Sequence, residues 1–222
     1  MSTSLIRPVD QQHRNLRAHV EQALSAAIVT GELAPGTLLT VPTLATQFAV
    51  SATPVREAVL DLESRGFVES VRNKGFRVTE VSAESLRQIA EVRQLLEPPA
   101  MEQLAQTFPA TELPRLRSVA ADIVSGARTG ELVGYVQADQ EFHLELAGLL
   151  GNPVLVEVIA DLRSRARLVG IAAMVKTGRL AESAAEHHEL LDHLAAGDGV
   201  GARRLMHRHI GHTIGWWAGR PE

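Results

Sequence analysis

The chain has 222 residues, of which 45% are hydrophobic and 22% charged, a balance that is typical of globular proteins and excludes a largely disordered chain. It contains no cysteine, so disulfide frameworks, thiolate zinc fingers, iron–sulfur clusters and cysteine nucleophiles are excluded, and any metal must bind through His, Asp or Glu. We expect a cytoplasmic protein without a membrane partner, because no apolar run approaches the roughly 20 residues of a membrane span and the N-terminus lacks a secretory signal pattern.

The formal net charge of −4 is unevenly divided along the chain. Residues 1–79 carry eight Lys or Arg against seven Asp or Glu, whereas residues 80–222 carry fourteen against nineteen. The acidity therefore belongs to the second part, and it does not argue against nucleic-acid binding by the first.

The chain begins with a predicted helix over residues 14–30, where apolar residues recur at helical spacing. Gly31 provides a left-handed stop at its end. Pro35 and Gly36 then favour a turn, and a second helix follows from about Pro42.

A third helix is predicted to begin at Thr53 and Pro54, a capping residue followed by proline at the first helical position. Two short β-like runs follow, 67–71 and 76–79, and they flank the turn residues 72–75. Three helices and a β-hairpin predict a winged helix-turn-helix domain over residues 1–79.

Residues 80–222 read as helix throughout, interrupted only by turn residues. Six helices are predicted, the first with a kink at its Pro-Pro pair: 83–107, 112–129, 131–150, 153–176, 179–196 and 199–218. The predicted fold class is therefore mainly α, with an all-helical bundle following the winged helix-turn-helix.

The DNA-reading segment of a helix-turn-helix is the first turns of its second helix, which enter the major groove. Here those turns run from Ser51 to Arg56. The hydroxyls of Ser51 and Thr53 can bond phosphate or base atoms, and Arg56 can bond guanine O6 and N7 together. The alternative for Arg56 is a salt bridge with a neighbouring acid.

The predicted wing adds cationic residues at its tip. Arg72 and Lys74 suit phosphate oxygens, and Gly75, which supplies a positive φ, completes the predicted DNA-contact set. The alternative for Lys74 is a solvated turn residue.

This first domain resembles the DNA-binding domain of GntR-type bacterial transcription regulators over about residues 14–79. The resemblance rests on an ordered series of short motifs: Pro35-Gly36, Leu39, Leu44-Ala45, Val50-Ser51, Thr53-Pro54-Val55-Arg56-Glu57-Ala58, Leu62, Gly66-Phe67-Val68 and Lys74-Gly75-Phe76-Arg77-Val78. Two positions depart from the family pattern, which usually has Gly in place of Ala49 and Arg in place of Ala52. The missing arginine implies an unusual operator or a weaker intrinsic affinity.

Polar residues interrupt the apolar faces of three predicted helices in the second part. Asp139 and His143 are four residues apart and share a face, His187 lies among inward leucines, and His209 lies on the seam of the last helix. One carboxylate and three neutral imidazoles suit a divalent ion: zinc foremost, or nickel, manganese, cobalt or iron. The alternative is that these are hydrogen-bonded core histidines.

The second part resembles the FCD ligand-binding domain of the FadR-type GntR subfamily, in its shorter, six-helix form. The matching motifs are Asp139-Gln140-Glu141-Phe142-His143, Gly151-Asn152-Pro153, Glu186-His187 and Met206-His207-Arg208-His209-Ile210. The resemblance implies that Asp139, His143, His187 and His209 bind the metal. The other histidines of this region match no ligand position and are expected to be exposed or outside the ligand set: His188, His193, His207 and His212.

A carboxylate effector held by such a metal would need a second cation nearby. Arg93 lies in a segment that matches a pocket-facing family arginine, so it is the candidate; the alternative is a surface arginine paired with Glu97. Arg163, Arg165 and Arg167 alternate around one helix and are expected to be solvated.

The prediction is a homodimeric DNA-binding regulator, a repressor by resemblance, that binds a double-stranded operator and responds to a small organic acid at its metal site. It is not expected to be an enzyme. The alternatives are a metal-dependent hydrolytic enzyme, which would leave residues 14–79 unexplained, and a regulator whose metal is purely structural.

Overall fold

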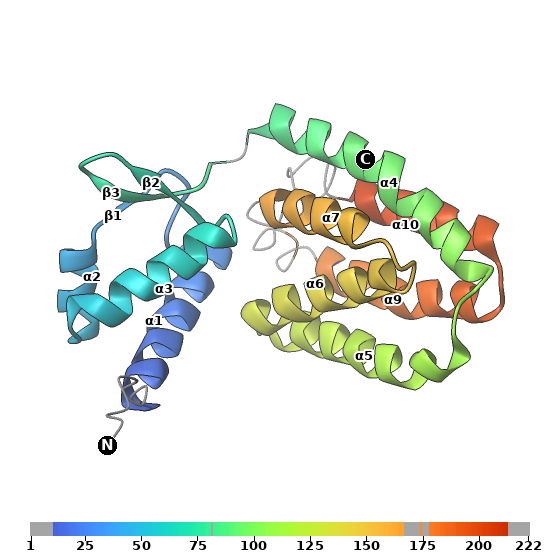
Figure 1. The fold of residues 1–222 in the computed structure, drawn as a ribbon, viewed down its shortest axis with the longest axis horizontal. Helices are drawn as coiled ribbons and strands as arrows, with labels where there is room; N and C mark the ends of the chain where they lie inside the picture. Colours follow the sequence, from blue (N-terminus) through green and yellow to red (C-terminus); the bar gives the residue numbers. More distant parts are fainter. Residues whose placement is uncertain (1–10, 81, 167–173, 175–177, 213–222) are drawn as a thin grey trace, which may run out of the picture. The chain divides into compact units, whose positions relative to one another are not determined.

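A computed structural model describes residues 11–80, 82–166, 174 and 178–212, and the chain forms two compact units, Met1–Thr79 and Glu80–Glu222 (Figure 1). The first unit contains α1 (Gln11–Val29), α2 (Val41–Phe48) and α3 (Ala52–Ser64). α1 and α3 pack together through buried apolar residues that recur along each helix: Val20, Leu24 and Ile28 on α1, and Val55, Val59 and Leu62 on α3. All three predicted helices are present.

The start of α3 differs from the prediction. Its N-cap is Ser51, and Ala52 is the first helical residue, so Thr53 does not cap the helix and Pro54 is the third helical residue. Ser and Thr are both favoured caps, so local chemistry alone does not separate the two positions. Pro54 is tolerated because the N–H groups of the first turn have no helical partner.

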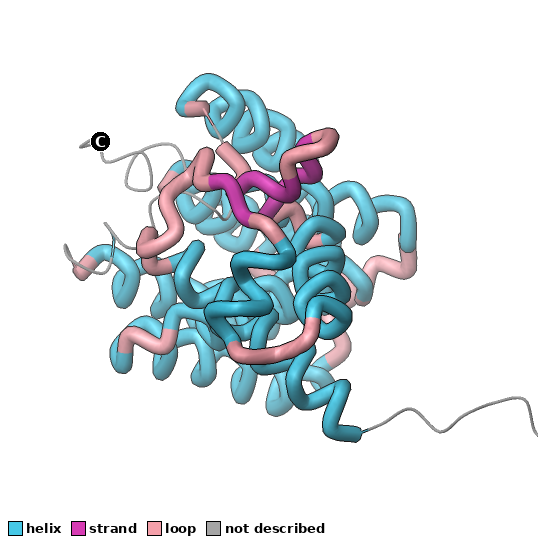
Figure 2. The backbone as a smooth tube through the Cα atoms, turned by 90° about the vertical axis from the view of Figure 1, so that its left-hand side faces the viewer, coloured by secondary structure: helices cyan, strands magenta, loops and turns pink. Residues whose placement is uncertain are grey.

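The wing is a three-stranded antiparallel sheet, formed by β1 (Leu38–Leu39), β2 (Val68–Val71) and β3 (Gly75–Val78) in the order β1-β3-β2 (Figure 2, magenta). The hairpin of β2 and β3 was predicted. β1 was not predicted, because a strand of two residues is too short to show a period. Gly75 allows this third strand to pair, since its φ is +115° and a Cβ there would collide with the Leu39 carbonyl oxygen.

The second unit is built of helices joined by short turns, and it has no strand among its described residues. Its elements are α4 (Ala83–Ala105), the 3-10 turn η1 (Ala110–Glu112), α5 (Leu113–Thr129), α6 (Leu132–Gly148), α7 (Pro153–Ala166), α9 (Arg179–Ala195) and α10 (Gly199–Gly211). α4 continues through Pro98 and Pro99 as one helix. The predicted extension of α7 to Lys176 falls largely outside the described residues, as does that of α10 beyond residue 212.

The packing of this unit brings α6, α9 and α10 to a common interior. α5 packs on α6 and α9, α9 packs on α10, and α10 has its most extensive contact with α4 (Figure 1). α7 contacts both α4 and α6. Large buried side chains fill the space between them, among them Tyr135, Phe142, Leu146, Leu190 and Leu191. The polar residues at the centre of this interior are therefore held by rigid, well-packed helices.

Candidate nucleic-acid interface and metal centre

The exposed side of α3 presents the predicted DNA-contact residues. Ser51, Thr53 and Arg56 are exposed, whereas the opposite side of the helix is buried against α1. None of the ion pairs among the described residues involves Arg56, so the alternative of a salt bridge is not found there.

Three other arginines of this unit are engaged by acids. Arg17 on α1 donates to Asp61 on α3 at 2.7 Å, and Arg65, the C-cap residue of α3, donates to Glu21 on α1 at 2.6 Å. Both ion pairs connect α1 with α3. Arg77 on β3 lies 3.7 Å from Glu69. These ion pairs connect elements within the domain. The cationic side chains that are not part of them are available to contact a partner.

Those remaining cations include the tip of the wing, where Arg72 and Lys74 are both exposed. Asn73 between them has a φ of 60°, and Gly75 follows with a positive φ, so the turn projects the two cations from the end of the hairpin. The arrangement suits contact with a phosphate backbone beside the groove that α3 would enter.

Four ligand-bearing residues converge inside the second unit. Asp139 and His143 come from α6, His187 from α9 and His209 from α10, and one potential ligand atom of each lies within 4.8 Å of the others. The first three side chains are buried and His209 is half-buried. His143 Nε2 lies 3.1 Å from His187 Nε2, and His187 Nε2 lies 3.2 Å from Asp139 Oδ1.

The tautomer of His187 follows from its other nitrogen. Nδ1 lies 3.0 Å from the Ala184 carbonyl oxygen, which can only accept, so Nδ1 carries the proton and Nε2 of the neutral ring carries a lone pair. Two acceptors, His187 Nε2 and Asp139 Oδ1, therefore face one another in a buried place. A cation between them would neutralise this contact, and the donor set fits a divalent metal.

A chain of buried ion pairs leads from this cluster to α4. Asp139 Oδ2 accepts a hydrogen bond from Arg163 at 2.8 Å, and Arg163 also donates to Glu97 at 2.8 Å. Glu97 in turn accepts from Arg93 Nε at 2.5 Å. Charges alternate along the chain, so each buried charge is compensated.

Two expectations about arginines change as a result. The expectation that Arg163 is solvated is wrong: it is 4% exposed, because it continues the buried stripe of Ile159 and Ala166 on α7. Arg93 is paired with Glu97, as its alternative reading stated, but both are buried rather than on the surface. Arg163 Nε has no hydrogen-bond partner among the described residues.

The same contacts set the ionisation of the cluster. Burial alone would raise the pKa of the Asp139 carboxyl, but the Arg163 guanidinium holds that pKa well below its usual range. Burial and the Arg163 charge lower the pKa of His143 well below its usual range. Burial also lowers the pKa of His209 from 6.5 to about 4, although the Glu186 carboxylate opposes this shift. Neutral imidazoles beside a carboxylate are the protonation states that metal binding requires.

We expect the metal-free protein to lose stability as the pH falls from about 6.5 to about 4, the ordinary and folded pKa values of His209. Between these values the unfolded chain binds more protons than the folded protein, so the stability present above about 6.5 is lost toward about 4. Urea unfolding of chelator-treated protein across this range measures the effect. His209→Gln is expected to make the profile less steep but not flat, because His143 contributes in the same pH range. A flat profile in the unsubstituted protein would contradict the assignment.

Comparison with known proteins assigns both units. The model of the bacterial regulatory proteins of the gntR family matches residues 16–78, and the FCD domain model matches residues 88–212. LutR of Bacillus subtilis is 30% identical, over 82% of this chain and 92% of that protein. The chain belongs to the gntR family and carries an FCD domain.

Further relatives agree with this assignment. McbR of Escherichia coli K12 is 28% identical, over 88% of this chain and 89% of that protein. The solved structure of E. coli McbR/YncC has a TM-score of 0.68 at 27% identity, covering 90% of this chain and 95% of that one. A GntR-type regulator from Rhodococcus sp. RHA1 has a TM-score of 0.70 at 22% identity, covering 96% and 100%, which supports the fold alone.

The protein is therefore a transcriptional regulator with a DNA-binding helix-turn-helix. McbR and LutR are both named transcriptional regulators, so the alternative of a metal-dependent hydrolytic enzyme is set aside. Among the described helices, none is both long and apolar enough to cross a membrane.

The first family departure has a physical consequence. Ala49, where the family usually has Gly, ends α2 in the left-handed region with φ 53° and ψ 39°. Glycine adopts this conformation without steric cost, whereas alanine is strained by about 1 kcal/mol. Ala52, the second departure, is exposed in the first turn of α3, and its effect on DNA recognition stays a prediction.

Sequence reasoning did not place three residues at the site: Arg163, which was expected to be solvated, Glu97, which was named only as a surface partner of Arg93, and Glu186. A signal existed for each. Arg163 follows Ile159 at four-residue spacing, Glu97 follows Arg93 at the same spacing, and Glu186 directly precedes His187 in the quoted family motif.

Proposed function

We propose that the protein is a homodimeric repressor whose affinity for a pseudo-palindromic operator changes when a small organic acid binds at a divalent metal. The metal ligands are Asp139, His143, His187 and His209, and zinc is the proposed ion. The convergence of one carboxylate and three imidazoles within 4.8 Å in the interior carries this proposal.

An ion held by four protein ligands accepts one or two further ligands when its coordination number rises to five or six. A carboxylate oxygen of the organic acid can take such a position, where the positive charge of the ion attracts it. Nickel, manganese, cobalt and iron suit the same donors. If the metal were purely structural, added acids would not change the affinity of the protein for DNA.

The balance of buried charge supports an anionic effector. Arg93 and Arg163 are matched by Glu97 and Asp139, so the positive charge of a bound divalent metal would stay uncompensated. The unpartnered Arg163 Nε–H offers a buried donor next to Asp139. We therefore add Arg163 to Arg93 as an effector contact.

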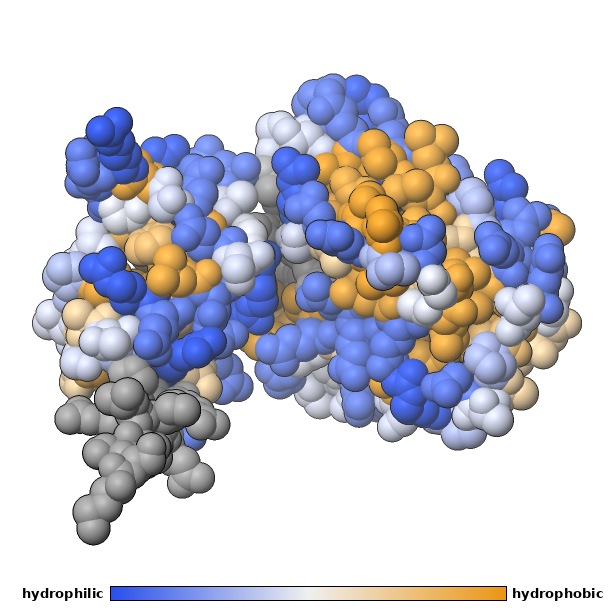
Figure 3. All heavy atoms as spheres, in the orientation of Figure 1, coloured by the Kyte–Doolittle hydropathy of each residue, from blue (hydrophilic) through white to orange (hydrophobic). Residues whose placement is uncertain are grey.

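A homodimer is supported by the half-site arrangement of helix-turn-helix operators and by an exposed apolar face. Leu95 on α4 is 75% exposed and Val154 on α7 is 65% exposed, with Val92 and Val158 one turn from each. Figure 3 shows apolar residues gathered where α4 and α7 lie. A second copy of the chain is the proposed cover for this face.

In this dimer, α3 of each copy reads one half-site. Ser51, Thr53 and Arg56 contact bases and nearby phosphates, while Arg72, Lys74 and the backbone N–H of Gly75 contact phosphate at the wing. α4 carries Arg93 and Glu97 and begins at Ala83, the last residue of the segment 79–83, so we propose that effector binding reaches the DNA-binding unit through α4 and this segment.

Elemental analysis and a thermal-shift screen against mono- and dicarboxylates and sugar acids test the proposal. About one metal per chain and a carboxylate-specific stabilisation are expected, about 2.7 kcal/mol at a ligand concentration 100-fold above Kd. Arg163→Gln should reduce this shift while metal content persists. The control is Arg165→Gln, an exposed neighbour on α7 that pairs with Asp161, which should leave the shift unchanged. Protein without metal, or with metal but no response to any acid, would contradict the effector site.

A further inference from the structure

A single carboxylate, that of Glu186 on α9, contacts three side chains: two from α10 and that of His212, the C-cap residue of α10. His209 Nδ1 donates to Oε2 at 2.8 Å, and Arg208 Nε donates to Oε1 at 2.9 Å. His212 Nε2 lies 3.1 Å from both oxygens. The Glu186 side chain is only 11% exposed, so these contacts are largely shielded from solvent.

Glu186 is not itself among the converging metal-ligand candidates, although it is adjacent to His187 in sequence. Consecutive residues of a helix point about 100° apart, so His187 faces the cluster while Glu186 faces α10. Its oxygens are occupied by donors from α10, which leaves them poorly placed to bind an ion at the cluster.

The hydrogen bond to His209 has a chemical consequence. A carboxylate only accepts, so the proton of the neutral His209 ring must be on Nδ1, and Nε2 carries the lone pair. The His209 ring centroid lies 4.9 Å from that of His187 and 5.2 Å from that of His143, which brings this ring into the cluster. A carboxylate behind a metal-binding imidazole fixes the ring and raises its basicity.

We propose that Glu186 is a positioning residue for the metal centre: it holds His209 in the tautomer and orientation that present Nε2 to the metal. Arg208 on α10 and the C-cap residue His212 hold the carboxylate in place. The inference rests on the proposed metal-dependent function, and it assigns to Glu186 control of the affinity and geometry of that site.

The test is the affinity of the full-length protein for Zn²⁺, measured by competition with a chromophoric chelator. Glu186→Gln removes the charge and places an amide that can donate where only an acceptor fits, so affinity is expected to fall about 10- to 100-fold. The matched control is Glu189→Gln, which makes the same change three residues further along α9. Glu189 bonds Arg208 but not His209, so this variant should bind Zn²⁺ as the unsubstituted protein does.

A second measurement separates positioning from general stability. The visible absorption of the Co²⁺-loaded protein reports coordination geometry, and it is expected to change in Glu186→Gln but not in Glu189→Gln. If Glu186→Gln does not fold, Glu186→Asp, which keeps the charge but shortens the reach, is compared with Glu189→Asp, and weaker Zn²⁺ binding is expected for the former.

The outcomes distinguish this inference from the function on which it rests. Absence of Zn²⁺ and Co²⁺ binding in the unsubstituted protein would overturn the metal site itself. Binding in that protein with equal affinity and spectra in the Glu186 and Glu189 variants would overturn the role of Glu186 alone.

Discussion

Replacing Arg56 with alanine is expected to abolish sequence-specific operator binding while leaving the fold and metal content intact. Arg56 is exposed on α3, so alanine leaves no cavity and is favourable in a helix. A bidentate arginine–guanine contact contributes about 1–3 kcal/mol, and a dimer loses it at both half-sites. The expected loss is therefore about 2–6 kcal/mol, at least about 30-fold in Kd.

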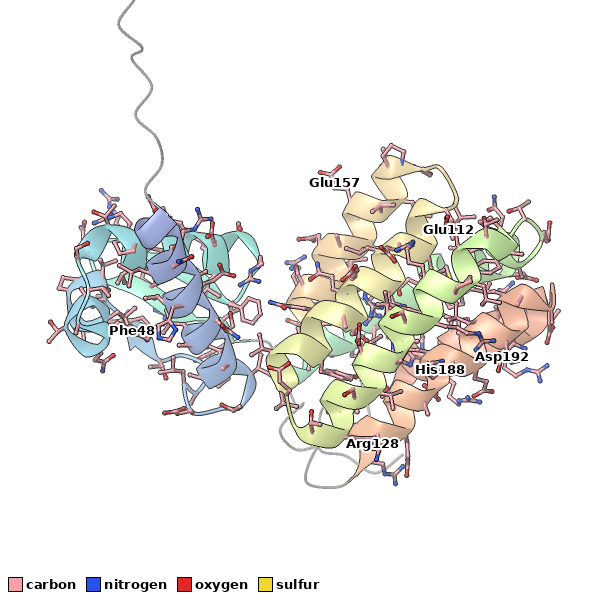
Figure 4. The ribbon with its side chains drawn as sticks, turned by 90° about the horizontal axis from the view of Figure 1, so that it is seen from below. Phe48, Glu112, Arg128, Glu157, His188 and Asp192 are labelled. Carbon is pink, nitrogen blue, oxygen red and sulfur yellow. The ribbon has the colours of Figure 1, made fainter. Side chains whose placement is uncertain are left out.

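Fluorescence anisotropy with a duplex selected by the unsubstituted protein measures this loss. Arg128→Ala makes the same change of charge at the end of α5 in the other unit, and it should leave operator affinity unchanged (Figure 4). Operator affinity in Arg56→Ala equal to that of the control would refute α3 as the reading helix.

Replacing His187 with alanine is expected to give the largest loss at the metal centre. A four-ligand zinc site contributes about 10–16 kcal/mol, so one ligand accounts for roughly 3 kcal/mol, or at least about 100-fold in affinity. His187 is 1% exposed and contacts both His143 and Asp139, so its removal also leaves a cavity at the centre of the cluster.

The control variant changes His188, the residue that follows His187 in the sequence. His188 is half-buried on α9, and His188→Ala should keep the metal content of the unsubstituted protein (Figure 4). Elemental analysis after dialysis against a weak chelator compares the two variants, and circular dichroism checks that both are folded. Equal metal content in the two would remove His187 from the ligand set.

Helical periodicity predicted much of the framework from the sequence. The bounds of α6, α9 and the start of α10 lie within about two residues of prediction, which is sufficient to put Asp139 and His143 on one face. The winged unit was equally readable, because Pro, Gly and capping residues mark its turns.

Other features depend on tertiary packing and could not be read locally. β1 is a strand only because β3 pairs with it, and a two-residue run has no period. The spacing of Arg163 from Ile159 shows only that the two residues share a face of α7, and that this face lies inward follows from the contacts of α7 with α4 and α6. The buried chain from Asp139 to Arg93 joins three helices, and only the fold brings its members together.

In the proposed function, that chain of ion pairs is the route by which a ligand at the cluster acts on α4. Asp139 Oδ2 is held by Arg163, and Arg163 is linked through Glu97 to α4. A ligand changes DNA binding only if it binds the DNA-competent and incompetent arrangements with different affinity.

The most direct test of this account is operator affinity measured with and without the carboxylate that stabilises the metal-loaded protein. For the unsubstituted protein, we predict that the acid weakens operator binding about 5- to 150-fold, the usual range of allosteric coupling. In the metal-depleted His187→Ala variant the acid should have no effect. An operator affinity that does not change when the acid binds, or an equal change in both proteins, would contradict control of DNA binding through the metal centre.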